Sequence, residues 1–103
     1  MNRAALVLLT GLGGCLKYEE GMAEQGTLAC QLHDACGSLA TLGYDTVDEC
    51  VTDATNQEWI ACQDYSEQHM QACVDAWQAA VDGNDCGAED DPPAVCATVC
   101  TGD

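Results

Sequence analysis

Cysteine content most strongly limits the folds open to this chain. The sequence holds nine cysteines in 103 residues, a density typical of small domains stapled by disulfides in an oxidising compartment. An odd count leaves one thiol that needs a separate explanation. We assign that position to Cys15 and expect four disulfides among the other eight: Cys30, Cys36, Cys50, Cys62, Cys73, Cys86, Cys96 and Cys100.

The rest of the composition makes those disulfides necessary. The chain has no phenylalanine, and leucine, isoleucine and valine together supply less than a fifth of residues 15–103. At such a content a highly charged chain is expected to stay disordered. The formal net charge is −16, and it becomes −17 when Arg3 is removed. We therefore expect reduction to unfold the protein, because so small a core does not offset the lost chain entropy.

The charge also excludes some partners. A chain of this charge is repelled by the phosphates of nucleic acid, so we expect no nucleic-acid binding. It is repelled by anionic lipid surfaces for the same reason. Any attachment to a membrane must then be covalent.

The N-terminal stretch supplies such an attachment. Arg3 precedes an apolar run over residues 4–9, and Leu12-Gly13-Gly14-Cys15 follows. The pattern resembles a bacterial lipoprotein signal peptide that ends in a lipobox. The resemblance implies that residues 1–14 are removed and that Cys15 carries a diacylglycerol. A membrane-spanning helix is not expected here, because a span needs about 20 apolar residues.

This resemblance also gives a domain division and a location. We expect a signal peptide at 1–14, the lipidated cysteine and a tether at 15–21, and a disulfide-rich helical domain at 22–103. Leu16 follows the lipidated cysteine, where an aspartate would argue for inner-membrane retention. By resemblance to other lipoproteins, the expected location is the outer membrane, facing the periplasm or the cell exterior.

Apolar periodicity predicts an all-α fold, a disulfide-stapled array of four or five short helices. No run alternates with period two, so no sheet is expected. Thr46 and Glu49 form a capping box, Ser66 is a helix cap, and Gly37 and Gly83 are helix ends. The expected helices cover 22–36, a segment from 46 to about 54, a short one from 55 that carries Trp59 and Cys62, 66–83, and 94–100. A single helix over 58–81 remains open as an alternative, and residues 82–93 are expected to form a loop.

Eight cysteines allow 105 pairings, so spacing alone does not select one. We expect three pairs between helices that are neighbours along the chain and a fourth that ties its ends together. The expected pairs are Cys36–Cys50, Cys62–Cys73, Cys86–Cys96 and Cys30–Cys100.

One segment suggests catalysis. Cys30-Gln31-Leu32-His33-Asp34-Ala35-Cys36 resembles the active-site helix of secreted phospholipases A2. On that resemblance His33 would be the general base and Asp34 would bind calcium. Ala29 stands where the family has a further cysteine, and residues 17–27 contain no glycine-rich calcium loop.

We therefore expect a lipoprotein without enzymatic activity, cofactor or resident metal. Its role would be structural, or it would bind an envelope protein. Two alternatives remain: a calcium-dependent hydrolase that uses His33 and Asp34, and a calcium-responsive module that uses the acidic loop. The acids of that loop are Asp82, Asp85, Glu89, Asp90 and Asp91.

Overall fold

The structure of the protein is a computed structural model that describes residues 16–57 and 62–101. These residues form three α-helices, α2 (Tyr18–Cys36), α3 (Val47–Thr55) and α4 (Glu67–Asp82), and two 3-10 helices, η1 (Cys86–Glu89) and η2 (Ala94–Thr98). Within these ranges the β-type pairing is limited to one isolated bridge between Asp64 and Thr101. The prediction of a disulfide-stapled helical array without a sheet is confirmed.

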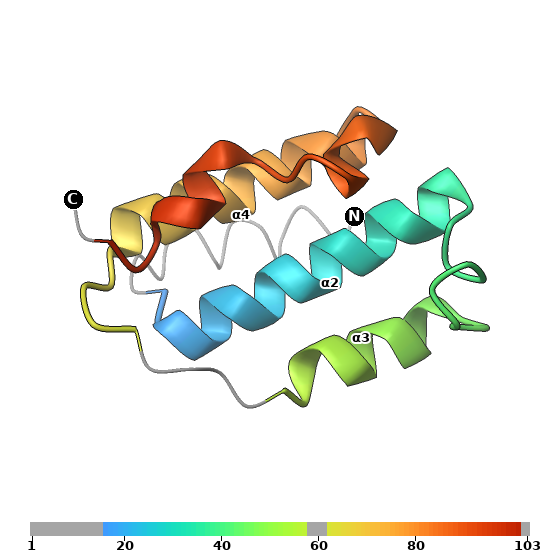
Figure 1. Ribbon diagram of the computed structural model, residues 1–103, viewed down its shortest axis with the longest axis horizontal. Helices are drawn as coiled ribbons and strands as arrows, with labels where there is room; N and C mark the ends of the chain where they lie inside the picture. The colour runs from blue at the N-terminus through green and yellow to red at the C-terminus, as the bar shows by residue number, and fades with distance from the viewer. Residues whose placement is uncertain (1–15, 58–61, 102–103) are drawn as a thin grey trace, which may run out of the picture.

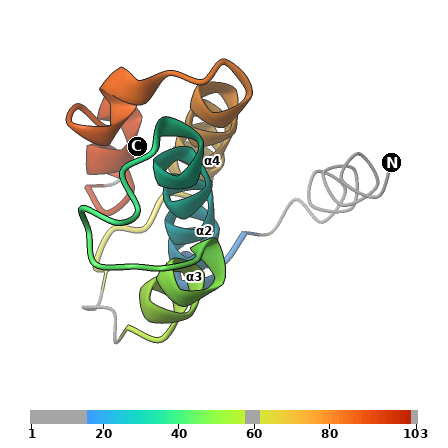
Figure 2. The same ribbon diagram turned by 90° about the vertical axis from the view of Figure 1, so that its right-hand side faces the viewer.

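Helix α2 lies at the centre of the fold, with α3 on one side and α4 on the other (Figure 1). Viewed from the side, the three helices form one layer, and η1 and η2 lie at its α4 edge (Figure 2). Helices α2 and α4 run in the same direction and α3 runs in the opposite one. After α4 the chain returns through η1 and η2, so that η2 contacts α4 and η1 contacts α2.

The helix ends follow local capping rules. The Thr46 hydroxyl accepts from the Glu49 amide at 3.2 Å, and the Glu49 carboxylate accepts from the Thr46 amide at 3.3 Å. This is the predicted capping box, which supplies partners for amides that have none inside the helix. Ser66 caps α4 by accepting from the His69 amide at 3.1 Å. Gly37 ends α2 with a φ of +78°, a left-handed conformation that glycine adopts without a steric cost.

Helix α2 begins at Tyr18 and not at the predicted residue 22, so residues 18–21, which were assigned to the tether, form its first turn. Gly21 is buried, and a Cβ atom at this position would lie closer to the Met70 side chain than carbon atoms approach. This close packing of α2 against α4 therefore begins in the predicted tether. Periodicity missed it because a glycine contributes to helix packing through its missing side chain.

The remaining helices differ in extent from the prediction. The short third helix falls largely on residues 58–61, outside the described ranges, and Cys62 and Tyr65 are not helical. The non-helical segment before Ser66 rules out one helix over 58–81. The expected 82–93 loop contains η1, and the last helix is a short 3-10 element preceded by Pro93.

Two groups of buried side chains make up the core of the described residues. The large cluster joins α2, α4, η1 and Val99, and the predicted α4 stripe supplies Met70, Cys73, Val74 and Trp77 to it. The small cluster, between α2 and α3, consists of Cys30, Leu39 and Cys50. The other members of the large cluster are Leu28, Leu32, Ala80 and Ala88.

All eight cysteines after Cys15 are paired, as predicted, but the pairs are different. The structure contains Cys30–Cys50, Cys36–Cys86, Cys62–Cys100 and Cys73–Cys96. These bonds join α2 to α3, α2 to η1, the segment before α4 to the C-terminal segment, and α4 to η2. Each described helical element is thus linked covalently to another.

The expected pairs Cys36–Cys50, Cys62–Cys73, Cys86–Cys96 and Cys30–Cys100 are all wrong. The first three assumed that neighbours along the chain are neighbours in space, and the fourth assumed that a disulfide ties the two ends of the domain together. Cys30 and Cys36 lie on different faces of α2, so one reaches α3 and the other reaches η1. The returning chain lies along α4 instead of beside η1. The Asp64–Thr101 bridge and the bond from the Ser66 amide to the Val99 carbonyl bring Cys100 to Cys62.

Candidate functional site

The residue next to the predicted lipidation site is fixed to the body of the domain. Leu16 is half-buried against the large cluster, and its carbonyl accepts a hydrogen bond from the Tyr65 hydroxyl. Tyr18 meets Tyr65 edge to face, with ring centroids 5.8 Å apart and an interplanar angle of 68°. Cys15 itself lies outside the described residues. The chain that follows it has little freedom, since Leu16 is held and the helix begins at Tyr18.

Tyr65 is well suited to hold this contact. Burial raises the pKa of its hydroxyl above the ordinary value of 10.0, and the nearby Glu67 and Glu20 carboxylates raise this pKa further. The hydroxyl therefore stays protonated at neutral pH and can donate to the Leu16 carbonyl. Sequence reasoning missed Tyr65, because nothing in the local pattern shows that it meets a residue 49 positions earlier.

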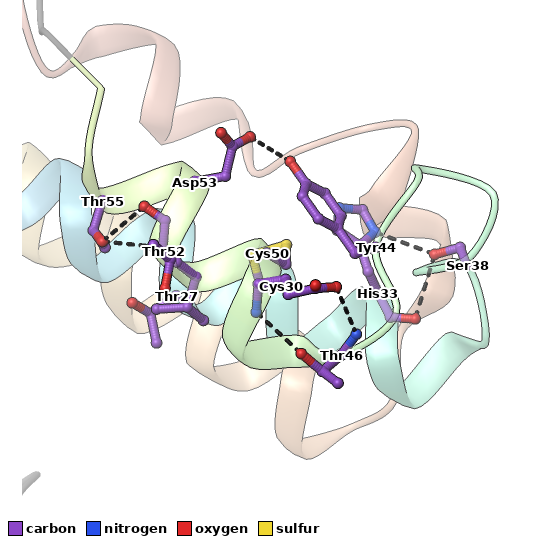
Figure 3. Close-up of a disulfide and its surroundings, with 12 residues drawn as sticks. Thr27, Cys30, His33, Ser38, Tyr44, Thr46, Cys50, Thr52, Asp53 and Thr55 are labelled. Atoms are coloured by element: carbon purple, nitrogen blue, oxygen red, sulfur yellow. Dashed lines mark hydrogen bonds between the residues drawn. A yellow bond between two sulfur atoms is a disulfide. The ribbon is translucent and has the colours of Figure 1, made fainter.

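The residues of the phospholipase-like segment do not converge. His33, in the last turn of α2, is half-buried, and its Nδ1 lies 3.3 Å from the Ser38 hydroxyl and 3.5 Å from a Glu89 carboxylate oxygen. Figure 3 shows His33 beside Ser38. Asp34 is exposed, at a position rotated about 100° around the helix axis from His33.

The order of groups around His33 also differs from a nucleophilic triad. The Ser38 hydroxyl donates to the Glu89 carboxylate, and its oxygen lies 2.8 and 3.0 Å from the two carboxylate oxygens. Ser38 and Glu89 both face the same ring nitrogen of His33, Nδ1, whereas a triad needs the histidine in the middle, with the serine at one ring nitrogen and the carboxylate at the other. Glu89 was predicted only as part of the acidic loop, and its bond to Ser38 joins η1 to the end of α2 close to the Cys36–Cys86 disulfide.

The two calcium positions that remained as alternatives, at Asp34 and in the 82–91 loop, show no set of metal ligands in the described residues. Over residues 16–57 and 62–101, no group of three or more histidine, cysteine, aspartate or glutamate side chains could hold a metal ion. The five acids of the 82–91 loop are included in that range. Calcium needs six to eight oxygen ligands at short distance, which this arrangement does not supply.

A shallow groove on the outer side of α3 was not predicted. It is lined by Gly43, Tyr44, Asp45, Asp48, Glu49, Thr52, Asp53 and Asn56. The Tyr44 hydroxyl donates to Asp53 at 2.5 Å (Figure 3), and this hydrogen bond is the main reason that the pKa of Tyr44 is raised. The four carboxylates make the groove strongly negative, so it would favour a cationic group over an anionic one.

Comparisons with protein-family models, with curated proteins and with solved structures found no match. Among the helices of the described ranges, none is both long and apolar enough to span a bilayer.

Proposed function

We propose that this protein is an extracytoplasmic lipoprotein whose Cys15 carries a diacylglycerol and whose stapled helical domain has a structural or protein-binding role without enzymatic activity. The location that we propose is the outer membrane, with the domain facing the periplasm or the cell exterior. Signal peptidase would cleave the Gly14–Cys15 bond, and the freed Cys15 amine could then accept a further acyl chain.

One observation carries this proposal. The four disulfides use eight of the nine cysteines, namely all of those after Cys15. The remaining cysteine is the one that ends the lipobox-like Leu12-Gly13-Gly14-Cys15. A chain with four disulfides needs an oxidising compartment, and such a compartment is where a lipoprotein signal peptide would deliver it. The two lines of reasoning use different residues and support the same location.

The charge of the chain is consistent with a covalent anchor. With 18 acidic residues and one basic residue, Lys17, after Cys15, the chain from Cys15 onward has no electrostatic attraction to anionic lipids. A single acyl chain gives weak and reversible membrane binding, whereas two or more give stable anchoring. We therefore expect the diacylglycerol on Cys15 to account for the whole of the membrane attachment.

Mass spectrometry of the exported protein tests the proposal. We expect an N-terminal Cys15 with the mass of a diacylglycerol and the four linkages found here. Cys15→Ser should lose the lipid and leave the membrane fraction while keeping all four disulfides. Exported protein with an unmodified Cys15, or with several free thiols among the other eight, would contradict the proposal.

The non-enzymatic part of the proposal has its own test. The wild type and His33→Ala should show the same background rate on phospholipid esters, with or without calcium. A calcium-dependent rate that His33→Ala removes would show that the phospholipase-like segment is active.

A further inference from the structure

The domain has two unlike ends. The anchor end consists of residues 16–20, 62–67 and 98–101, where the N-termini of α2 and α4 meet the C-terminal segment. The Cys62–Cys100 disulfide and the Asp64–Thr101 bridge tie it together. The acidic end consists of residues 34, 45–49 and 82–91, where α2 and α4 finish and α3 begins. Figure 1 shows these ends on opposite sides of the molecule, with the helix axes running between them.

Negative charge is distributed unequally between the two ends. The acidic end has nine carboxylates and no lysine or arginine, for a formal charge of −9. The anchor end has four carboxylates, and it contains Lys17, the one lysine of the chain. The nine carboxylates of the acidic end are those of Asp34, Asp45, Asp48, Glu49, Asp82, Asp85, Glu89, Asp90 and Asp91.

The attachment point lies at the less charged end. Cys15 is bonded to Leu16, and consecutive Cα atoms are 3.8 Å apart. Leu16 is held by Tyr65, and α2 begins two residues later. A lipid on Cys15 would therefore hold the anchor end close to the headgroups, without the flexible spacer that the sequence predicted.

The side chains at the anchor end suit a lipid interface. Tyr18 and Tyr65 each combine an apolar ring with a polar hydroxyl, the type of residue that is enriched where a membrane meets water. Both rings are half-buried and, like Leu16, pack against the large cluster, and they contact each other. Lys17, which follows Leu16 in the chain, is exposed, and in an upright domain its ammonium would be able to reach headgroup phosphates.

The length of α2 separates the acidic end from the lipid. Nineteen helical residues at 1.5 Å each give a length of about 28 Å. The Debye length at physiological ionic strength is about 8 Å. An upright domain would therefore place nine of the 18 carboxylates about three screening lengths from the headgroups, whereas a domain lying on its side would bring carboxylates of the acidic end to the surface.

We propose that the domain stands on a phospholipid surface on its anchor end, with its helices directed away from the bilayer and its acidic end presented to solvent. This proposal rests on the lipidation of Cys15 and adds an orientation to it. The presented surface would include the acidic groove of α3 and the η1 loop. A protein that docks on it would need a basic face.

Paramagnetic broadening can measure the orientation. The natively lipidated protein is placed in phosphatidylcholine nanodiscs that contain a gadolinium headgroup lipid, and amide signals are recorded. We expect strong broadening at residues 17–20, 64–67 and 101, and little at 45–49 and 85–91. Equal broadening at both ends, or stronger broadening at the acidic end, would overturn the proposal.

Two matched variants test whether the Tyr65–Leu16 hydrogen bond sets the orientation. Tyr65→Phe removes the hydroxyl that holds Leu16 and should reduce the contrast between the two ends at least twofold. Tyr44→Phe removes a tyrosine hydroxyl from the other end and should leave the contrast unchanged. A Gly-Ser spacer inserted between Leu16 and Lys17 should reduce the contrast even if Tyr65→Phe fails to fold. An unchanged pattern with the spacer would show that the short link does not set the orientation.

Failure of lipidation and failure of orientation can be told apart. Mass spectrometry reports the lipid on Cys15. If it is absent, the oxidised chain that begins at Cys15 can be coupled through that thiol to a maleimide lipid, because the other eight cysteines are bonded to each other. The same broadening pattern would then support the orientation without the natural lipid, and its absence would overturn the orientation alone.

Discussion

Helix α2 packs differently against its two neighbours. On the α4 side, Leu32, Met70 and Cys73 are fully buried within the large cluster. On the α3 side, the small cluster has three buried members, and two of them are the sulfur-bonded Cys30 and Cys50. One side therefore resembles an ordinary hydrophobic core, and the other depends on a disulfide for most of its buried contact.

The two kinds of contact stabilise the fold by similar free energies. Full burial of a leucine or methionine side chain contributes about 1.5–3 kcal/mol, so a few such residues hold α4. The Cys30–Cys50 bond closes a loop with a sequence separation of 20. By the chain-entropy relation this stabilises the fold by about 3 kcal/mol. A single sulfur bridge on the α3 side thus matches one or two large apolar residues on the α4 side.

The sharpest test of this contrast uses two leucines. Leu32 has 0% of its surface exposed in the large cluster, and Leu39 has 8% in the small one. We expect Leu32→Ala to cost about 4 kcal/mol, because it leaves a cavity among packed neighbours, with Leu39→Ala at about 2 kcal/mol. Urea unfolding with the disulfides intact measures both. A larger cost for Leu39→Ala would show that the α3 side has the stronger apolar core.

The second test removes one disulfide from each side. Replacing Cys30 and Cys50 by alanine should cost about 3 kcal/mol, and replacing Cys36 and Cys86, whose sequence separation is 50, about 4 kcal/mol. The two variants should also differ in which helix loses its protection from hydrogen exchange. Hydrogen exchange should show α3 released alone in the first variant, since little else holds it.

In the second variant, we expect α4 and α2 to stay protected because the large cluster remains. Helix α3 should stay protected too, through Cys30–Cys50. Release of α3 in the second variant but not in the first would contradict the idea that its local disulfide holds it.

Local sequence signals predicted the elements well. The Thr46 and Ser66 caps and the Met70–Trp77 stripe lie where they were expected. Cysteine parity correctly indicated that all eight downstream cysteines are paired. The caps and the stripe depend on residues within one or two helical turns of each other, and the cysteine pairing state depends only on a count, so the sequence alone contains the necessary information.

Features that depend on the path of the chain were not predictable in the same way. The pairing failed because it is decided by which faces of α2 meet α3 and η1 and by how the chain returns along α4 after η1. Tyr65 and Glu89 make their contacts with residues 49 and 51 positions away, and no local pattern encodes those distances. Gly21 was assigned to the tether because a residue without a side chain adds nothing to apolar periodicity.

A smaller effect should separate the two helix interfaces through their glycines. A Cβ at Gly21 would overlap Met70, and one at Gly26 would lie 2.9 Å from the Ala54 Cβ of α3. We expect Gly21→Ala to destabilise by about 1–3 kcal/mol, because buried Met70 has nowhere to move. Gly26→Ala should cost less, because alanine favours the helix by about 1 kcal/mol and this offsets part of the cost of displacing Ala54.

Thermal unfolding of the two alanine variants under the same oxidising conditions checks this order. If Gly26→Ala were the more costly of the two, α3 would be packed more rigidly than its small cluster indicates.

The smallest expected effect concerns two tyrosine hydroxyls and their response to pH. The pKa of Tyr65 is raised by burial and by Glu67 and Glu20. Its contribution to stability should therefore be complete below its ordinary pKa of 10.0 and should disappear as pH rises through the higher folded-state value. Near neutral pH, Tyr65→Phe should cost about 0.5–1.5 kcal/mol, the net worth of one hydrogen bond. Above pH 10, the difference between the wild type and Tyr65→Phe should shrink.

Tyr44→Phe is the control on the α3 side. The Tyr44 hydroxyl bonds to the Asp53 side chain in an exposed position, so its loss should change neutral stability less than the loss of the Tyr65 hydroxyl. Urea unfolding at pH 7 and at about pH 11, with absorbance at 295 nm to follow tyrosinate, gives both comparisons. If Tyr44→Phe were the more destabilising at pH 7, the exposed bond on the α3 side would be the stronger one. The hydrogen bond from the Tyr65 hydroxyl to the Leu16 carbonyl would then contribute less to stability than the exposed Tyr44–Asp53 bond.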